Sequence, residues 1–360
     1  MKFEEYISEL IDEKTFPGIT IFAGSHEGVP FEKSYGKIIF DSSDEDLTTD
    51  SIYDVASLTK PLATALVSLI LIEKGEFREN SSIGSFFEGF SKEIKISHLL
   101  THSSGIQAWY PLYLRDEDPL TVIKELGTTA GPGRKVIYSC IGYVLLKFII
   151  EKVTGTEFSS LTEELVIKKL GLNNTFFKVP SDKIKKCIPT EEGNLYEKIL
   201  AEQYYPDLCK NYNWREYTLC GEVNDGNSFF LDGSSGNAGL FSSAGDIYKL
   251  SREFYPEFST LLSPESTDKF WENLTPFKKS HRSMGFKLNS SFITSGGKSL
   301  SKKAIGHSGF TGTSIWMEPE SANVFILLTN RIYPKYDRRV NFNKIRRKLH
   351  KLIKKDLNIK

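Results

Sequence analysis

The amino-acid sequence predicts an α+β protein: an antiparallel sheet flanked by helices, with a mostly helical lobe inserted between the segments that form the sheet. Two observations predict this class. Near both ends of the chain, short apolar runs alternate with turn residues, which is typical of antiparallel strands. Between them, apolar residues recur at helical spacing and glycines follow as stop signals. A chain of 360 residues can bury one large core or two closely packed ones.

The two chain ends are predicted to supply the sheet. Residues 3–14 have the pattern of an amphipathic helix, and residues 18–23 and 31–39 read as a β-hairpin. The far end of the chain is expected to form strands at 285–288, 303–306, 313–317 and 324–328 and a closing helix from about residue 342.

The central part of the chain is predicted to be helical. Helices are expected at 61–74, 94–102, 119–126, 139–154 and 157–170, followed by a polar connecting region over 178–215. We therefore expect residues 1–60 plus 215–360 to form a lobe with the antiparallel sheet and residues 61–214 to form a helical lobe. Together the two lobes are expected to make one unit.

The net charge of the chain gives no reason to expect a negatively charged partner such as nucleic acid or an anionic membrane. Lys+Arg and Asp+Glu both total 46, so we expect neither nucleic acid nor a membrane as a partner. The basic residues of the final helix are interpreted as its solvated face, and its apolar side is expected to cover the sheet.

No run of 18 apolar residues predicts a membrane span. The acidic, amphipathic N-terminus lacks the pattern of a signal peptide, so a cytoplasmic location is expected.

Cysteine and histidine spacing predicts neither disulfides nor a metal centre. The 4 cysteines show no C-x-x-C pairing, and free thiols are expected. His98 and His102 lie four residues apart, but no glutamate completes an H-E-x-x-H motif and Gly105 ends the helix behind them. We predict no metal and no other cofactor.

The stretch Asp54-Val55-Ala56-Ser57-Leu58-Thr59-Lys60 is the strongest candidate for chemistry. Ser-x-x-Lys occurs five times in the chain, but only here does it follow a strand-like run and precede a long apolar helix. Pro61 is tolerated near a first helical turn, so Ser57 and Lys60 are placed at the helix start, on one face. A serine needs a base to become a nucleophile, and we expect burial and the positive helix end to make Lys60 easier to deprotonate.

Two further stretches carry polar groups suited to a cleft. Tyr138 follows a Gly/Pro turn and precedes an apolar helix, where it could act as a general base or, alternatively, as an aromatic wedge between helices. In Gly306-His307-Ser308-Gly309-Phe310-Thr311-Gly312, glycines would let a strand approach a ligand. Such a strand could present His307 to a substrate and the N–H of Phe310 to an oxyanion.

In this order and spacing, three motifs resemble those of the serine β-lactamase and penicillin-binding-protein superfamily. They are Ser57-x-x-Lys60, Tyr138-Ser139-Cys140 and His307-Ser308-Gly309. The resemblance is closest to the class C β-lactamase-like branch, which includes family VIII carboxylesterases and D-amino-acid peptidases. It extends to stretches such as His98–Ile106 and Gly236–Ser242 and covers nearly the whole chain. It implies a β-lactamase/transpeptidase-like fold.

The resemblance also implies a role for each motif residue. Ser57 would be the acylated nucleophile, Lys60 the amine that activates it and Tyr138 the base and proton shuttle. The backbone N–H groups of Ser57 and Phe310 would form the oxyanion hole. Cys140, His307, Ser308 and Gly309 would contact the substrate. Which group first accepts the serine proton stays open.

Three departures from the pattern of the family stand out, one of which is that Asn224 and Asn237 occupy positions where related enzymes often show His. Cys140 stands where the second motif usually carries Asn, and a thiol cannot offer both an amide donor and an acceptor to a substrate amide. His307 stands where β-lactamases often carry Lys, which weakens the capture of a substrate carboxylate at pH 7.

Three hypotheses on function follow from the sequence. The leading hypothesis is a serine hydrolase that cleaves a small ester or amide through an acyl-enzyme on Ser57. The second keeps this nucleophile and makes the substrate a D-amino-acid peptide or a β-lactam. The third is a pseudoenzyme that only binds a ligand in its cleft, against which the retained Ser57, Lys60 and Tyr138 argue.

Overall fold

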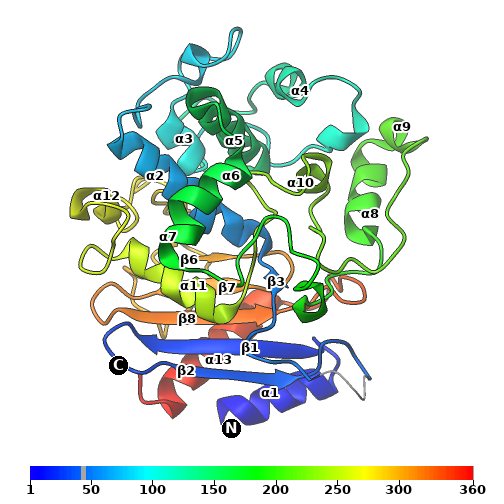
Figure 1. Ribbon diagram of the computed structural model, residues 1–360, viewed down its shortest axis with the longest axis vertical. Coiled ribbons are helices and arrows are strands. Elements are labelled where there is room, and N and C mark those ends of the chain that lie inside the picture. Colours follow the sequence, from blue (N-terminus) through cyan, green and yellow to red (C-terminus); the bar gives the residue numbers. More distant parts are fainter. Residues whose placement is uncertain (42–45, 360) are drawn as a thin grey trace.

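A six-stranded antiparallel sheet forms the base of the protein (Figure 1). The computed structural model describes residues 1–41 and 46–359. The strand order is β2-β1-β8-β7-β6-β5, so the N-terminal hairpin pairs directly with the last strand of the chain. The strands are β1 (Gly18–Ser25), β2 (Phe31–Gly36), β5 (Lys287–Leu288), β6 (Ile305–Ser308), β7 (Ser314–Met317) and β8 (Asn323–Thr329).

The central strands are apolar on both faces because helices cover both. On β8, Phe325 and Leu327 pack in one core with α1 (Phe3–Asp12) and α13 (Phe342–Asp356). The alternate residue Ile326 belongs to the second, larger core, as the period of two along a strand requires. On that second face lies α11 (Ala244–Ser251), whose Tyr248 ring stacks on Phe22 of β1 at 4.3 Å.

The two ends of the chain meet on the first of these faces. Helices α1 and α13 contact each other beneath the sheet (Figure 1). The backbone N–H of Phe3, at the start of α1, donates to the Asp356 carboxylate at the end of α13 at 2.7 Å. The predicted closing helix thus covers the sheet with its apolar side, and most of its basic residues point to solvent.

The inserted segment packs as helices above the other face of the sheet (Figure 1). At its centre lie α2 (Leu66–Glu73), with 6 of 8 residues buried, and α5 (Cys140–Thr154), with 8 of 15 residues buried. The other helices of this segment are α3 (Ile96–Leu100), α4 (Pro119–Leu126), α6 (Phe158–Thr162), α7 (Lys168–Leu170), α8 (Leu195–Tyr204) and α9 (Pro206–Cys209). The fold class predicted from the sequence is confirmed.

Two segments differ from the sequence prediction. The supposed connecting region at 178–215 contains α8, a helix with few buried residues and hence a weak apolar period. Residues 215–285 were assigned to the lobe with the sheet without any element being predicted, and the chain forms there α10 (Gly226–Phe230), α11, α12 (Pro264–Asp268) and the short strand β4 (Phe241–Ser242). Strand β4 pairs with β3 (Tyr53–Asp54) outside the main sheet.

One segment, Ala56–Glu73, is long and apolar enough to cross a membrane by length and composition alone. Within the protein 83% of it is buried. It therefore has the surroundings of a core helix, and it contains the Ser57 motif.

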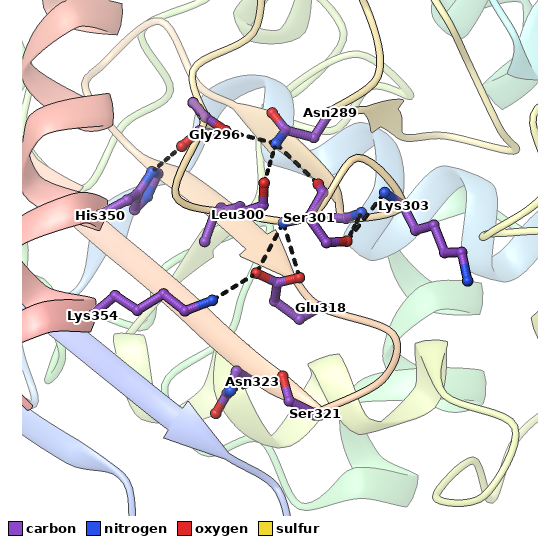
Figure 2. Close-up of polar contacts among 12 residues, drawn as sticks. Asn289, Gly296, Leu300, Ser301, Lys303, Glu318, Ser321, Asn323, His350 and Lys354 are labelled. Atoms are coloured by element: carbon purple, nitrogen blue, oxygen red, sulfur yellow. Dashed lines mark hydrogen bonds and ion pairs between the residues drawn. The ribbon is translucent and has the colours of Figure 1, made fainter. Parts of the chain in front are cut away.

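A polar cluster fixes the long loop between β5 and β6 (Figure 2). The side-chain amide of Asn289 donates to the carbonyl oxygens of Gly297, Leu300 and Ser301 at 2.7, 3.1 and 3.0 Å. The Glu318 carboxylate accepts from the Ser301 N–H at 3.2 Å and from Lys354 of α13 at 3.3 Å. These contacts hold the loop against α13 directly before β6, which carries His307.

His350 of α13 joins this cluster as a buried neutral imidazole. Its Nδ1 lies 3.2 Å from the Gly296 carbonyl oxygen, to which it donates (Figure 2). Burial lowers the pKa of His350 to about 4. The unfolded chain binds a proton here below about pH 6.5, whereas the folded protein does so only at more acid pH, so the folded state loses stability as the pH falls across this window.

We predict that His350→Gln makes the protein less sensitive to acid. Between about pH 7.5 and about pH 5, the free energy of unfolding of the wild type should fall by about 2 kcal/mol more than that of the variant. Urea unfolding at both pH values measures this difference. Lys351→Gln, on the exposed side of the same helix, should respond to pH as the wild type does. An equal fall for wild type and His350→Gln would contradict the assignment.

Candidate active site

The nucleophile candidate lies on a tight connection between a strand and a helix. Strand β3 ends at Asp54, residues Ala56–Leu58 form a single 3₁₀ turn, and a widened helical turn over Lys60–Ala65 leads into α2. Ala56 has φ of 48°, a left-handed conformation that is uncommon for a residue other than glycine. The buried Asp54 carboxylate accepts the N–H of Ala56 at 2.8 Å and holds this conformation.

Lys60 brings three segments of the chain together. Its ammonium nitrogen donates to Ser57 Oγ at 3.1 Å, to the Asn237 carbonyl oxygen at 2.9 Å and to Cys140 Sγ at 3.4 Å. The same nitrogen lies 5.0 Å from the centre of the Tyr138 ring. The alcohol, the amine and the phenol predicted from distant motifs therefore converge.

The prediction for the pKa of Lys60 is wrong in direction. Burial alone lowers the pKa of this amine, as the sequence argument supposed. The negative charges that Cys140, Tyr138 and the more distant Asp225 carry when ionised, together with a hydrogen bond to Tyr138, outweigh burial and leave the pKa of Lys60 above its ordinary value. In the resting site Lys60 is therefore an ammonium ion, which is a hydrogen-bond donor with no lone pair to accept a proton.

The third motif faces Ser57 across a cavity of about 350 Å³. Ser57 and Tyr138 line the cavity together with His307, Ser308, Gly309 and Phe310 at the end of β6. Among the described residues, the N–H groups of Ser57 and Phe310 have no hydrogen-bond acceptor. Two free donors beside a hydroxyl are what the binding of a negative oxygen requires.

The turn after β6 is tied to the strand before Ser57. The Thr311 hydroxyl donates to the Asp54 carbonyl oxygen at 2.8 Å, and the Thr313 hydroxyl donates to that of Val55 at 3.0 Å. From the opposite side, Arg331 donates to the Phe310 carbonyl oxygen at 3.0 Å and Arg346 donates to that of Thr313 at 2.9 Å. The position of the Phe310 N–H relative to Ser57 is thus fixed by contacts on both sides.

His307 and His102 flank Tyr138 as neutral imidazoles. Their ring centres lie 5.9 Å and 4.4 Å from that of Tyr138. Burial, followed by the positive charges of Lys60 and Arg282, lowers the pKa of His307 well below its usual range. Burial followed by the same two cations also lowers the pKa of His102. Neither ring supplies positive charge to a ligand near pH 7.

His102 and His98 make separate contacts. His102 Nδ1 accepts the N–H of Ser139 at 3.0 Å, which holds the start of α5 beside the cavity. His98 Nδ1 accepts the N–H of Lys95 at 3.2 Å, at the start of its own helix. Within residues 1–41 and 46–359, no group of three or more His, Cys, Asp or Glu side chains is arranged to hold a metal ion.

Cys140 occupies the first position of α5 and contacts Lys60. Burial raises the pKa of its thiol, although the charge of Lys60 acts in the opposite direction. The side chain is therefore a thiol, which is a weak hydrogen-bond partner. Cys140, Cys187 and Cys209 are free thiols.

The glycines around the third motif serve internal packing. We expected them to let the strand approach a ligand, but a Cβ atom at Gly306 would overlap the Trp316 ring. A Cβ atom at Gly309 would overlap the Thr313 hydroxyl and lie 2.6 Å from the Val55 carbonyl oxygen. The absence of side chains here allows the turn to sit against the strand that precedes Ser57.

Several residues of the site escaped the sequence analysis. Asn237 provides a carbonyl acceptor for Lys60, and Arg331 and Arg346 hold the Phe310 turn. Arg282 and Lys287 line the cavity on the side of Tyr138 and β5. Asn237 and Arg331 lie in stretches that the family resemblance includes, at 236–242 and 328–331, although the sequence assigned them no role. Nothing in the local sequence around Arg282, Lys287 and Arg346 separates them from surface Lys and Arg.

Comparison with known proteins identifies the family. Residues 3–348 match the protein family described as Beta-lactamase, and the chain belongs to this family, within the serine β-lactamase and penicillin-binding-protein superfamily. A putative D-alanyl-D-alanine carboxypeptidase of Escherichia coli O157:H7 is 28% identical over 367 residues, covering 92% of this chain and 82% of that protein.

Solved structures share the fold at lower identity. The octameric penicillin-binding protein homologue from Pyrococcus abyssi superposes with a TM-score of 0.66 at 22% identity, covering 91% of this chain and 72% of that one. EstCE1, described as a hydrolase with promiscuous acyltransferase activity, superposes with a TM-score of 0.73 at 15% identity over 97% of each chain. The family and the relatives indicate a hydrolase of the serine β-lactamase type.

We predict that Gly309→Ala disturbs the Phe310 turn. The added methyl group has no room between Thr313 and the Val55 carbonyl, so the free energy of unfolding should fall by about 1–3 kcal/mol. Urea unfolding measures this change. Gly28→Ala is the matched control, because a Cβ atom at Gly28 meets nothing within 4 Å. Equal stability of Gly309→Ala and the wild type would show that the turn can shift at no cost.

Proposed function

We propose that the protein is a serine hydrolase that cleaves a small ester or amide through an acyl-enzyme on Ser57. The observation that carries the proposal is the convergence of Ser57, Lys60 and Tyr138 beside two free N–H groups. Each element of acyl transfer then has a candidate: a nucleophile, a charge that orients it, a proton carrier and a site for the oxyanion.

The raised pKa of Lys60 supports a particular division of labour. As an ammonium ion Lys60 can donate to Ser57 Oγ but cannot accept its proton. The acceptor must then be a second group, and Tyr138 is the titratable side chain that lines the cavity with Ser57 and adjoins Lys60. In this proposal Lys60 orients Ser57 and balances negative charge, while the side-chain oxygen of Tyr138 is the general base.

The proposed reaction has two symmetrical halves. Ser57 Oγ attacks the substrate carbonyl carbon as its proton passes to Tyr138, and the carbonyl oxygen becomes negative between the N–H groups of Ser57 and Phe310. Collapse of this intermediate breaks the bond to the leaving group, which takes the proton from Tyr138. A water molecule then attacks the acyl carbonyl as Tyr138 takes one of its protons. Collapse breaks the bond to Ser57 Oγ, which receives that proton from Tyr138, and the product leaves as the carboxylic acid with the other proton of the water.

A second candidate is cleavage of a D-amino-acid peptide or a β-lactam by the same nucleophile. The 28% identity to a putative D-alanyl-D-alanine carboxypeptidase favours it. The thiol of Cys140 and the neutral imidazole of His307 disfavour it, because neither replaces an amide or an ammonium at its motif position. Stable labelling of Ser57 by penicillin would support this candidate, whereas ester cleavage without such labelling would support the first.

We predict that Ser57→Ala abolishes turnover of an activated ester. Loss of the nucleophile should lower kcat/KM by about 10⁴-fold or more, and a fluorophosphonate should label the wild type at Ser57 and leave the variant unlabelled. Ser299→Ala removes the serine of another Ser-x-x-Lys pair, outside the active-site cavity, and should keep full activity. An unlabelled wild type that turns over no ester would indicate a protein that only binds its ligand.

We also predict that Tyr138→Phe slows acylation by about 10²–10⁴-fold while the fold stays intact. The variant keeps the ring that packs against His102 and loses the hydroxyl that carries the proton. Stopped-flow measurement of the acylation burst tests this, with thermal unfolding as the check on folding. An unchanged burst rate would remove Tyr138 from the proposed chemistry.

A further inference from the structure

A groove of about 720 Å³ lies outside the active site, between α13 and the loop that joins β5 to β6. Six basic side chains line it, and the described residues of its wall include no aspartate or glutamate. The whole chain is neutral, with Lys+Arg and Asp+Glu equal at 46, so the positive charge is a local property of this groove. The basic residues are Lys298, Lys302, Lys344, Arg347, Lys348 and Lys351.

Four of these charges have no counter-ion within the described part of the chain. Between Glu272 and Glu318 the sequence has seven lysines and arginines and no acidic residue. The acidic residues that follow this stretch serve other partners, because Glu318 pairs with Lys354 at 3.3 Å and Glu320 pairs with Lys303 at 2.9 Å. The four unpaired side chains, all exposed, are Lys298, Lys302, Lys344 and Lys351.

The loop and the helix are bonded to each other along the groove. Arg347 of α13 donates to the Thr294 carbonyl oxygen at 3.0 Å, and a Cβ atom at Gly297 would lie 2.8 Å from the Arg347 side chain. The hydrogen bonds of Asn289 and Glu318 hold the same loop (Figure 2). The exposed lysines therefore stand on a backbone whose shape is set before any ligand binds.

Large apolar side chains project into solvent beside the groove. Phe292, which lines it, is 85% exposed, and Ile293 is 60% exposed. The N–H of Phe292 donates to the carbonyl oxygen of Lys279 at 3.1 Å, so the turn that carries Phe277, itself 95% exposed, lies next to this loop. Single exposed apolar residues need no explanation, but several on adjoining loops mark a surface that contacts an apolar partner.

An anionic lipid surface fits both features. Exposed lysines attract its negative headgroups, and apolar side chains on loops enter the boundary between the headgroups and the acyl chains. A dissolved polyanion would pair with the lysines but would leave the phenylalanine side chains in water. An uncharged apolar partner would cover those side chains but would leave the lysines unpaired.

We propose that the groove and the adjoining loops with Phe277 and Phe292 form a docking surface for an anionic membrane. The neutral net charge predicted no membrane partner, but a sum over the chain does not register that the fold gathers lysines of the loop and of α13 on one surface. The same loop contributes Ser295 to the active-site cavity. Docking would therefore bring that cavity close to the lipid surface.

Co-sedimentation of the full chain with lipid vesicles tests the proposal. We expect binding to phosphatidylcholine vesicles that contain about one-third phosphatidylglycerol, and no binding to vesicles of phosphatidylcholine alone. The affinity for the anionic vesicles should fall at least about 10-fold when the salt concentration rises from about 0.1 M to about 0.5 M, because salt screens exposed charges.

Two kinds of variant separate the contributions of charge and apolar surface. Lys298→Gln combined with Lys351→Gln removes two exposed charges and should lower the affinity about 25-fold, which is about 5-fold for each charge. Phe292→Ser removes an exposed apolar side chain and should lower the affinity about 10-fold or more. Because all three side chains are exposed, both variants should fold, which thermal unfolding verifies.

Matched controls make the same changes elsewhere on the molecule. Lys152→Gln combined with Lys169→Gln removes two exposed lysines from α5 and α7, above the other face of the sheet (Figure 1). Val29→Ser removes an apolar side chain that is 99% exposed, in the hairpin at the opposite edge of the sheet from β5. Both controls should bind the anionic vesicles as the wild type does.

No binding to the anionic vesicles, or equal losses in the groove variants and their controls, would overturn the proposal. Binding that Phe292→Ser leaves unchanged would also overturn it, and an equal affinity for dissolved polyphosphate would then assign the groove to a soluble polyanion. Ser57→Ala should bind vesicles as the wild type does, because docking uses no residue of the proposed reaction. If Ser57 proves inert but the vesicles bind, only the reaction fails. If esters are cleaved without vesicle binding, only the docking surface fails.

Discussion

The buried ammonium of Lys60 is the interaction on which the site depends. A lysine nitrogen without access to water is costly to bury unless its protons find acceptors. Here the acceptors come from three separate segments: Ser57 at the entrance to α2, Cys140 at the start of α5 and the carbonyl of Asn237 before β4. Any arrangement that keeps Lys60 satisfied must hold these three segments in their observed positions. The hydrogen bonds of this one side chain thereby connect helices α2 and α5 to the segment that precedes β4.

A second constraint joins this unit to the strand that carries the third motif. Thr311 and Thr313 donate to the carbonyl oxygens of Asp54 and Val55, directly before Ser57. The same Asp54 stabilises the left-handed Ala56 through its carboxylate. The two N–H groups proposed to bind an oxyanion thus belong to backbone segments that are bonded to each other. Their separation is set by the fold before any substrate arrives, which is the condition under which such donors contribute most.

The parts of the site that the sequence predicts are those with a local signature. Ser57 and Lys60 lie three residues apart before an apolar helix, Tyr138 lies between a Gly/Pro turn and an apolar helix, and His307 follows Gly306. The strands near both chain ends and the long helices likewise have clear periods, whereas α8 buries too little apolar surface to show one. Arg282 and Arg346 have no local signature, because their roles depend on carbonyl groups and rings that only the fold brings near. The direction in which the pKa of Lys60 shifts was mispredicted for the same reason. Cys140 and Tyr138, which raise this pKa, lie about 80 residues away in the chain.

The distribution of charge in the cavity follows from this arrangement. An ammonium group has three protons to donate, and those of Lys60 are directed at Ser57, Cys140 and Asn237, so its charge is engaged within the protein. The motif positions beside it hold a thiol at Cys140 and a neutral imidazole at His307, and neither brings a full charge to the cavity. Other positive charges at the cavity wall include those of Arg282, beside the Tyr138 ring, and Lys287. The donor that orients Ser57 is thus distinct from the basic side chains that line the cavity.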